Sequence, residues 1–287
     1  MCRRLSMDSC TCPEVATMKR SDLWRFLMIS FFLLYLLIPL LATTAFSFAN
    51  RWDRSILPEG ITLDWWKAVT ERRAFGVAFK NTLTLSLATM VLSILLVTPT
   101  AYWVHLRVPK AKPFVELLTI LPFGIPGVVL ALALIRTYAR FGGNVIYSPY
   151  MLVLACMVIS LPFVYRPIVN ALNAVDVRTL TEAAQTLGAS WFTILRRVII
   201  PNIMPGIISG GLLVFSLVFV EFTLANLLVG PRFKTFPIYL VEFTRFDGRQ
   251  ASALAVMSFG IAWLTSLGLI WVAGRVGARR EEAIGAR

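Results

Sequence analysis

Charged side chains are scarce in this sequence. They make up 15% of its 287 residues, and hydrophobic residues make up 57%. A soluble domain carries roughly a quarter charged residues. Together with the long apolar runs, this shortage excludes an ordinary soluble globular domain and predicts a polytopic membrane protein.

Several chemical motifs are also missing. No Gly-Lys pair occurs, so there is no Gly-x4-Gly-Lys-[Ser/Thr] phosphate loop, and we expect this chain to bind neither ATP nor another cofactor. The single histidine, His105, stands at the end of an apolar run, where it fits an interfacial polar residue better than a ligand or base. No two carboxylates lie together within an apolar run. We therefore expect no catalytic residue and no metal site.

Cysteine is sparse too. Cys2, Cys10 and Cys12 stand near the N-terminus, and Cys156 lies in an apolar run. A Cys-x-Cys without a second pair or a nearby histidine is a weak metal motif, so we expect reduced cytoplasmic thiols. Met18 opens a short basic lead into the first apolar run and is an alternative start to Met1. That run is too long for a cleavable signal peptide and lacks a small-residue cleavage site.

The formal net charge is +13, which could indicate nucleic-acid binding. However, no polar segment combines a basic face with interleaved aromatic residues, so a nucleic-acid partner is disfavoured. In membrane proteins, surplus Lys and Arg lie in loops that face anionic lipid and the cytoplasm. We therefore expect membrane lipid to be the partner of this charge.

Six apolar runs are long enough to cross a bilayer, which takes about 20 helical residues. The predicted spans are 27–49, 78–104, 114–135, 150–171, 206–229 and 251–274. Backbone groups in lipid must pair within their own segment, so the fold class is all-α. The sequence Gly124-Ile125-Pro126-Gly127 predicts a kink or broken turn in the third span.

The Lys and Arg count orients these spans. With residues 1–26 and 275–287 as cytoplasmic tails, the cytoplasmic side holds 16 of the 28 basic residues. Much of the remainder lies in residues 50–80, where Trp65, Trp66 and Phe75 alternate with basic residues. This pattern predicts an amphipathic helix at the membrane surface that leads into the second span; interfacial anchoring is favoured over a binding role.

The loop 172–205, between the fourth and fifth spans, predicts a helix–turn–helix. Asp176 is a candidate N-cap of the first helix, and Gly188 suits the left-handed residue that ends it. Ser190 can cap a second helix, which we expect Pro201 to stop near residue 200. Helical spacing places four residues, Leu180, Ala183, Ala184 and Leu187, on one face, where the small side chains permit close approach of another surface.

At these residues the chain resembles a family. Glu-Ala-Ala, three residues, Gly, nine residues, then aliphatic-x-aliphatic-Pro is similar to the signature loop of permease subunits in binding-protein-dependent ABC importers. The matching positions are Glu182, Ala183, Ala184, Gly188, Val198, Ile200 and Pro201. Val198 and Ile200 stand where the family more often has Ile and Leu. Three-residue matches alone are common by chance, but the joint spacing to Gly188 and Pro201 is not.

The resemblance implies a permease of the bacterial inner membrane with both termini in the cytoplasm. It implies three partners: an ATP-binding subunit dimer that receives the loop, a second permease in an expected heterodimer, and an extracytoplasmic solute-binding protein. ATP would then bind the partner ATPase. Loop movement would pass through Pro201 and Pro205 into the fifth span, and Glu182 would orient the loop by hydrogen bonds to backbone or to the ATPase.

Glu221 is the clearest ionisable residue within a predicted span. It either lines the translocation pathway and meets a cationic group, or makes a structural hydrogen bond to a neighbouring helix or subunit. Thr223 and Asn226 follow it closely in sequence and join whichever network exists.

Three stretches resemble the spermidine/putrescine-type branch of this family: Leu57 to Trp65, Asn81-Thr82-Leu83 and Ala101-Tyr102. That branch also serves iron(III), thiamine and 2-aminoethylphosphonate, and the sulfate/molybdate branch is the nearest rival. Glu221 favours a cationic solute such as a polyamine, whereas basic outer loops favour an anionic one. A secondary transporter without an ATPase, or a membrane scaffold, are the alternatives outside this family; no inverted repeat supports the former.

Overall fold

The computed structural model describes residues 20–52, 58–141 and 147–285, which are mostly helical. The long helices are α1 Arg20–Phe48, α3 Arg73–Arg107, α5 Gly127–Tyr138, α7 Pro149–Asn173, α10 Ile200–Phe219 and α13 Gly248–Gly285. The shorter ones are α2 Asp64–Thr70, α4 Lys112–Ile120, α8 Val177–Thr186, α9 Trp191–Ile194, α11 Thr223–Leu228 and α12 Phe236–Phe243. Short 3-10 helices are η1 Pro109–Ala111, η2 Leu121–Gly124, η3 Ala139–Phe141 and η5 Gly230–Phe233, and η4 Leu195–Ile199 is a π-helical turn. One antiparallel ribbon pairs β1 Ala49–Arg51 with β2 Glu59–Ile61.

Five helices of the described residues are long and apolar enough to cross a membrane. They are Trp24–Phe48, Arg73–Arg107, Pro149–Asn173, Trp191–Phe219 and Gly248–Gly268. A sixth span results if Pro109–Gly124 and Gly127–Tyr138, bent by 96°, count as one. The all-α polytopic fold is confirmed, and so is the break at 124–127, where Ile125 and Pro126 have extended backbone.

Three helix boundaries differ from the predictions. The fifth span was expected at 206–229, but α10 ends at Phe219, and a separate helix α11 begins after Glu221. Pro201 was expected to stop a helix, which was wrong: the helix continues from α9 through η4 into α10, with Pro201 in its first turn. A π-helical turn changes the backbone pairing ahead of the proline, which has no N–H to donate. The predicted tail 275–287 is helical as far as Gly285.

The surface helix expected within residues 50–80 is shorter than predicted. It is the seven-residue α2, which ends before α3 begins at Arg73. Trp65 of α2 donates its indole N–H to the carbonyl of Ala49 at 3.0 Å, which ties α2 to the ribbon. The thiols of Cys2, Cys10 and Cys12, and the alternative start Met18, lie outside the described residues.

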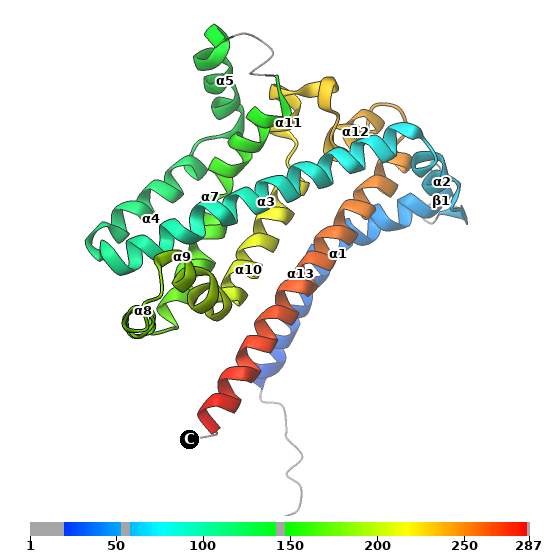
Figure 1. The fold of residues 1–287 in the computed structure, drawn as a ribbon. Helices are drawn as coiled ribbons and strands as arrows, with labels where there is room; N and C mark the ends of the chain where they lie inside the picture. The colour runs from blue at the N-terminus through cyan, green and yellow to red at the C-terminus, as the bar shows by residue number, and fades with distance from the viewer. Residues whose placement is uncertain (1–19, 53–57, 142–146, 286–287) are drawn as a thin grey trace, which may run out of the picture.

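Helices α3, α7 and α10 pack on one another and form the centre of the molecule (Figure 1). The larger hydrophobic core lies between them and continues under α8 and α9. A second core joins α12 to α2, the start of α3, the end of α10 and the start of α13. α1 lies beside α13 and, like the outer faces of α4 and α5, exposes many large apolar side chains, as a surface in contact with lipid does.

Candidate functional site

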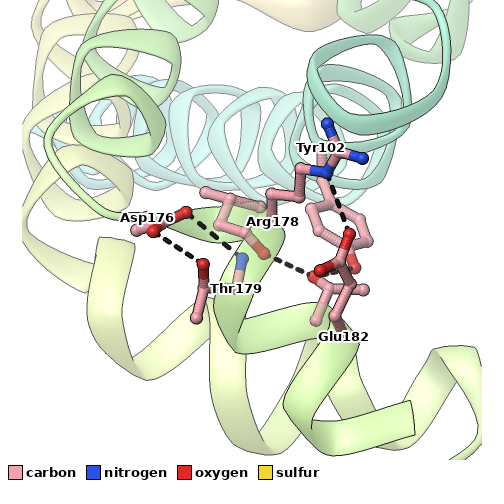
Figure 2. A network of polar contacts seen from close by, with 7 residues as sticks. Tyr102, Asp176, Arg178, Thr179 and Glu182 are labelled. Atoms are coloured by element: carbon pink, nitrogen blue, oxygen red, sulfur yellow. Dashed lines mark hydrogen bonds and ion pairs between the residues drawn. The ribbon is translucent and has the colours of Figure 1, made fainter.

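The first helix of the helix–turn–helix, α8, begins at a side-chain cap. Asp176 accepts the backbone N–H of Thr179 at 3.2 Å on one oxygen and the Thr179 hydroxyl at 2.7 Å on the other (Figure 2). These hydrogen bonds to the charged form hold the pKa of the Asp176 carboxyl below its ordinary value. The predicted N-cap is confirmed.

The turn between the two helices is also as predicted. Gly188 has φ +76°, a left-handed conformation that glycine adopts without steric cost. Its N–H bonds to Gln185 O at 2.9 Å, and the Ala189 N–H bonds to Ala184 O at 3.1 Å, which completes a Schellman motif. Ser190 then caps α9 by accepting the Thr193 N–H at 3.4 Å. The direction of the second helix is therefore set by local hydrogen bonds.

The predicted face of α8 is divided in the structure. Leu180 and Ala184 are half-buried and pack against the larger core, whereas Ala183 is exposed and Leu187 is 87% exposed. The prediction that these four residues form one outward face was wrong, because the side of α8 that carries the buried Thr181 packs against the core. The outward surface is narrower and has Leu187 at its tip.

Glu182 lies on the exposed side of α8, where its carboxylate accepts the Arg178 Nε–H at 2.9 Å (Figure 2). Of the two expected partners, backbone or an ATPase side chain, this structure shows neither; the observed partner is Arg178. An ion pair between exposed side chains is screened by water and contributes little to helix stability. The pair therefore shapes the surface of α8 more than it stabilises the fold.

Sequence reasoning missed the residue that attaches α8 to the bundle. Tyr102 of α3 is fully buried, and its hydroxyl lies 3.0 Å from the Thr181 hydroxyl of α8 (Figure 2). Thr181 already donates to Val177 O at 2.7 Å. Each hydroxyl has one proton, so Tyr102 is the donor to Thr181. The sequence signal that could have revealed this contact is a tyrosine within an apolar span, because a buried phenol hydroxyl usually finds a hydrogen-bond partner.

The end of the sequence motif lies where the helix–turn–helix joins α10. Val198 and Ile200 are half-buried against the larger core, and the exposed Pro201 follows η4. π-helical turns are rare and occur frequently at functional sites. The motif residues therefore border an irregular turn inside a long helix rather than a helix end.

Glu221, Thr223 and Asn226 gather at the opposite end of α10, around the break between α10 and α11. Glu221 accepts the Leu224 N–H at 2.8 Å and so caps α11; this explains why the predicted span is interrupted here. No basic side chain of the described residues forms an ion pair with Glu221. Thr223 lies against Gly127, at the start of α5, and Asn226 is exposed.

A cavity of 540 Å³, here called the far-end cavity, is lined in part by α12. α12 lies at the other end of the bundle from α8 and α9 (Figure 1). It is lined by Arg72, Ala74, Lys234, Tyr239, Glu242, Phe243, Phe246, Asp247 and Gln250. Lys234 donates to Glu242 at 2.7 Å, and Tyr239 donates to Val69 O at 3.1 Å. Burial raises the pKa of the Tyr239 phenol. Within residues 20–52, 58–141 and 147–285, no group of three His, Cys, Asp or Glu side chains could hold a metal ion.

Helices of membrane-crossing length that pack into a bundle, with a helix–turn–helix held at one end, define a polytopic membrane protein. The chain belongs to the family of binding-protein-dependent transport system inner membrane components, whose model matches residues 98–282. It is therefore an inner-membrane permease subunit of an importer, and a transport component rather than an enzyme.

Curated relatives include the spermidine/putrescine transport system permease protein PotC of Escherichia coli strain K12, 28% identical over 78% of this chain and 83% of the relative. The probable sulfate transport system permease protein cysT of Prototheca wickerhamii is 33% identical over 55% of this chain and 66% of the relative. Among solved structures, a bacterial ABC transporter involved in the import of the acidic polysaccharide alginate matches with TM-score 0.64 and 16% identity. That match covers 90% of this chain and 97% of the other, and shows that the fold is shared.

Proposed function

We propose that the α8–α9 helix–turn–helix is the element through which this permease docks on a separate ATPase. The observation that carries the proposal is the tip of α8. Leu187 is 87% exposed on a helix that is capped at both ends and held to the core. The second helix also exposes large apolar side chains, with Phe192 63% and Trp191 40% exposed, and a projection that carries several exposed apolar side chains fits a surface that a partner covers.

The proposed complex has two permease subunits, expected to be a heterodimer, on an ATPase dimer, with an extracytoplasmic solute-binding protein. An alginate transporter of the same fold was solved with its periplasmic protein, which supports the last partner. Because the ATPase is in the cytoplasm, a helix–turn–helix that docks on it lies on the cytoplasmic side of the membrane. The start of α1 and the end of α13 lie toward the same end of the bundle as α8 and α9, which supports the proposal that both termini are cytoplasmic (Figure 1).

In this proposal, ATP-driven closure of the ATPase dimer moves the two helix–turn–helices together. Each permease subunit supplies half of the pathway and switches it between inward- and outward-facing states. Glu221, Thr223 and Asn226, at the α10–α11 break, are proposed to line that pathway. The carboxylate of Glu221 pairs with no basic side chain of the described residues, which suits a cationic solute.

The proposed solute is a polyamine. The carboxylate of Glu221 favours a cationic solute, and the spermidine/putrescine permeases among the relatives support a polyamine in particular. Sulfate is the second candidate, because sulfate permeases are also among the relatives. Uptake of labelled spermidine and of labelled sulfate, in cells with and without this chain, distinguishes the two.

The docking experiment compares the tagged wild-type chain with Leu187→Asp after purification from its native host in mild detergent. ATP hydrolysis in the eluate identifies a bound ATPase, and mass spectrometry names it. Phe246→Asp is the matched control, since Phe246 is 84% exposed but lies at the far-end cavity.

We expect ATPase activity with the wild type and the Phe246 control, and a loss of about tenfold or more with Leu187→Asp, because an unpaired charge would enter the interface. Leu187 is almost fully exposed, so the variant should fold. A wild-type chain that elutes without ATPase activity would overturn the proposal and favour a secondary transporter or scaffold.

A further inference from the structure

Both helices of the helix–turn–helix contact one short stretch of α3. Tyr102 donates to Thr181 of α8 at 3.0 Å within the core. Trp191, the first residue of α9, has its ring centroid 6.2 Å from that of Tyr102 and 6.3 Å from that of Trp103. These side chains fix α8 and α9 to the same end of α3.

The other end of α3 holds the segment that leads into α12. Asn81 donates its side-chain N–H to the carbonyl of Lys234 at 2.9 Å. The hydroxyl of Thr82, which is 1% exposed, accepts the backbone N–H of Phe236 at 2.7 Å. Lys234 and Tyr239 of this segment line the far-end cavity, so α3 fixes one wall of the cavity.

The two attachments are separated by the length of a membrane-crossing helix. Thr82 and Tyr102 are 20 residues apart in one helix that contains Pro99, and this separation corresponds to about 30 Å at the usual rise. Figure 1 shows α3 running from the α8–α9 end of the bundle to the α12 end. α10 reaches the same end, where the ring centroids of Phe219 and Phe236 of α12 are 6.0 Å apart, but the π-helical turn η4 separates α10 from α9.

We propose that α3 is a strut that transmits movement of the helix–turn–helix to the far-end cavity, with Tyr102 and Thr82 as positioning residues at its two ends. The inference rests on the proposed docking function. When the ATPase moves α8 and α9, the buried Tyr102–Thr181 hydrogen bond moves α3 with them, and the bonds from Asn81 and Thr82 carry the displacement to the cavity wall. Hydrogen-bonded side chains at the two ends of one helix are a physical route for such coupling.

The test measures movement at the cavity directly and requires no knowledge of the solute. A nitroxide label is placed by Phe246→Cys, a cavity-lining position, in a chain whose native cysteines are replaced by serine. The complex is purified with its ATPase, and electron paramagnetic resonance spectra are recorded with and without magnesium and the non-hydrolysable ATP analogue AMP-PNP. The variants are Tyr102→Phe, Thr181→Val and the pair.

We expect AMP-PNP to change the spectrum of the labelled complex that keeps Tyr102 and Thr181. Each single variant should reduce that change about fivefold or more. The double variant should lose no more than the singles, since both remove one bond. Thr181→Ser keeps the hydroxyl and should restore the change. Tyr150→Phe is the matched control, because Tyr150 is 81% exposed.

A merely structural role for Tyr102 would lower the yield of complex but leave the nucleotide-dependent change intact in the complex that forms. That result would overturn the inference, as would a wild-type complex that binds its ATPase yet shows no change at the label. If no ATPase accompanies the wild-type chain, the docking function fails first. The amount of bound ATPase is therefore measured in every sample.

Discussion

Gly206 of α10 lies directly against the backbone of Pro167 in α7. A Cβ atom at residue 206 would be 2.6 Å from the Pro167 carbonyl oxygen and 2.5 Å from the Ala171 Cβ. Real Cβ atoms do not approach backbone so closely, so the two helices touch at this point with nothing between them. Small residues serve this purpose in membrane helix pairs generally.

Gly206→Ala should therefore force α7 and α10 apart. Overpacking of this kind costs about 1–3 kcal/mol, which should lower the midpoint of thermal unfolding in detergent. Gly260→Ala is the control, because nothing lies within 4 Å of a Cβ at residue 260. Equal midpoints for the two variants would show that the bundle relaxes freely around Gly206.

Gly188→Ala should loosen the helix–turn–helix without any steric clash. A Cβ at residue 188 meets nothing within 4 Å, so the cost comes from the left-handed conformation alone, about 1 kcal/mol. We expect faster hydrogen exchange of the α8 backbone amides. Gly188→Asn should lie closer to the wild type, because asparagine tolerates this conformation better than alanine. Identical exchange in the alanine variant and the wild type would contradict the prediction.

Acid should weaken the start of α8. The bonds from Thr179 lower the pKa of Asp176 in the folded state, so the ionised cap stabilises α8 above the unfolded pKa of about 3.9. That contribution disappears as the pH falls through the folded value. After correction for intrinsic rates, hydrogen exchange of the first α8 amides should not depend on pH near neutrality. It should become faster below about pH 4. Asp176→Asn, which keeps an acceptor but cannot ionise there, should remove this acid-dependent rise.

Glu221→Gln tests the proposed pathway. Glutamine retains an oxygen that can accept the Leu224 N–H, so α11 should keep its cap. Loss of the charge should reduce spermidine uptake about tenfold, as expected when a charge-assisted contact is lost. ATPase binding should not change, because the residue lies at the opposite end of α10 from the helix–turn–helix. Unchanged uptake of spermidine would assign Glu221 to helix capping alone.

Local chemistry explains why much of this architecture could be predicted. Long apolar runs leave the backbone no alternative to helix in lipid, and Asp176, Gly188 and Ser190 act on groups within four residues of themselves. The break near Pro126 follows from the missing N–H of proline. For the same reason, the prediction failed where a distant or unusual partner decides, as at Pro201, where a π-helical turn accommodates the residue, and at Glu221, whose own side chain begins a new helix.

The sequence by itself determined an all-α membrane protein with a capped helix–turn–helix, because hydropathy and caps are properties of neighbouring residues. Only the tertiary structure decided which side of α8 faces the core, that Tyr102 donates to Thr181 79 residues away, and that Asn81 and Thr82 hold α12. These contacts join segments remote in the chain. Their geometry depends on how α3, α7 and α10 pack, which no local pattern encodes.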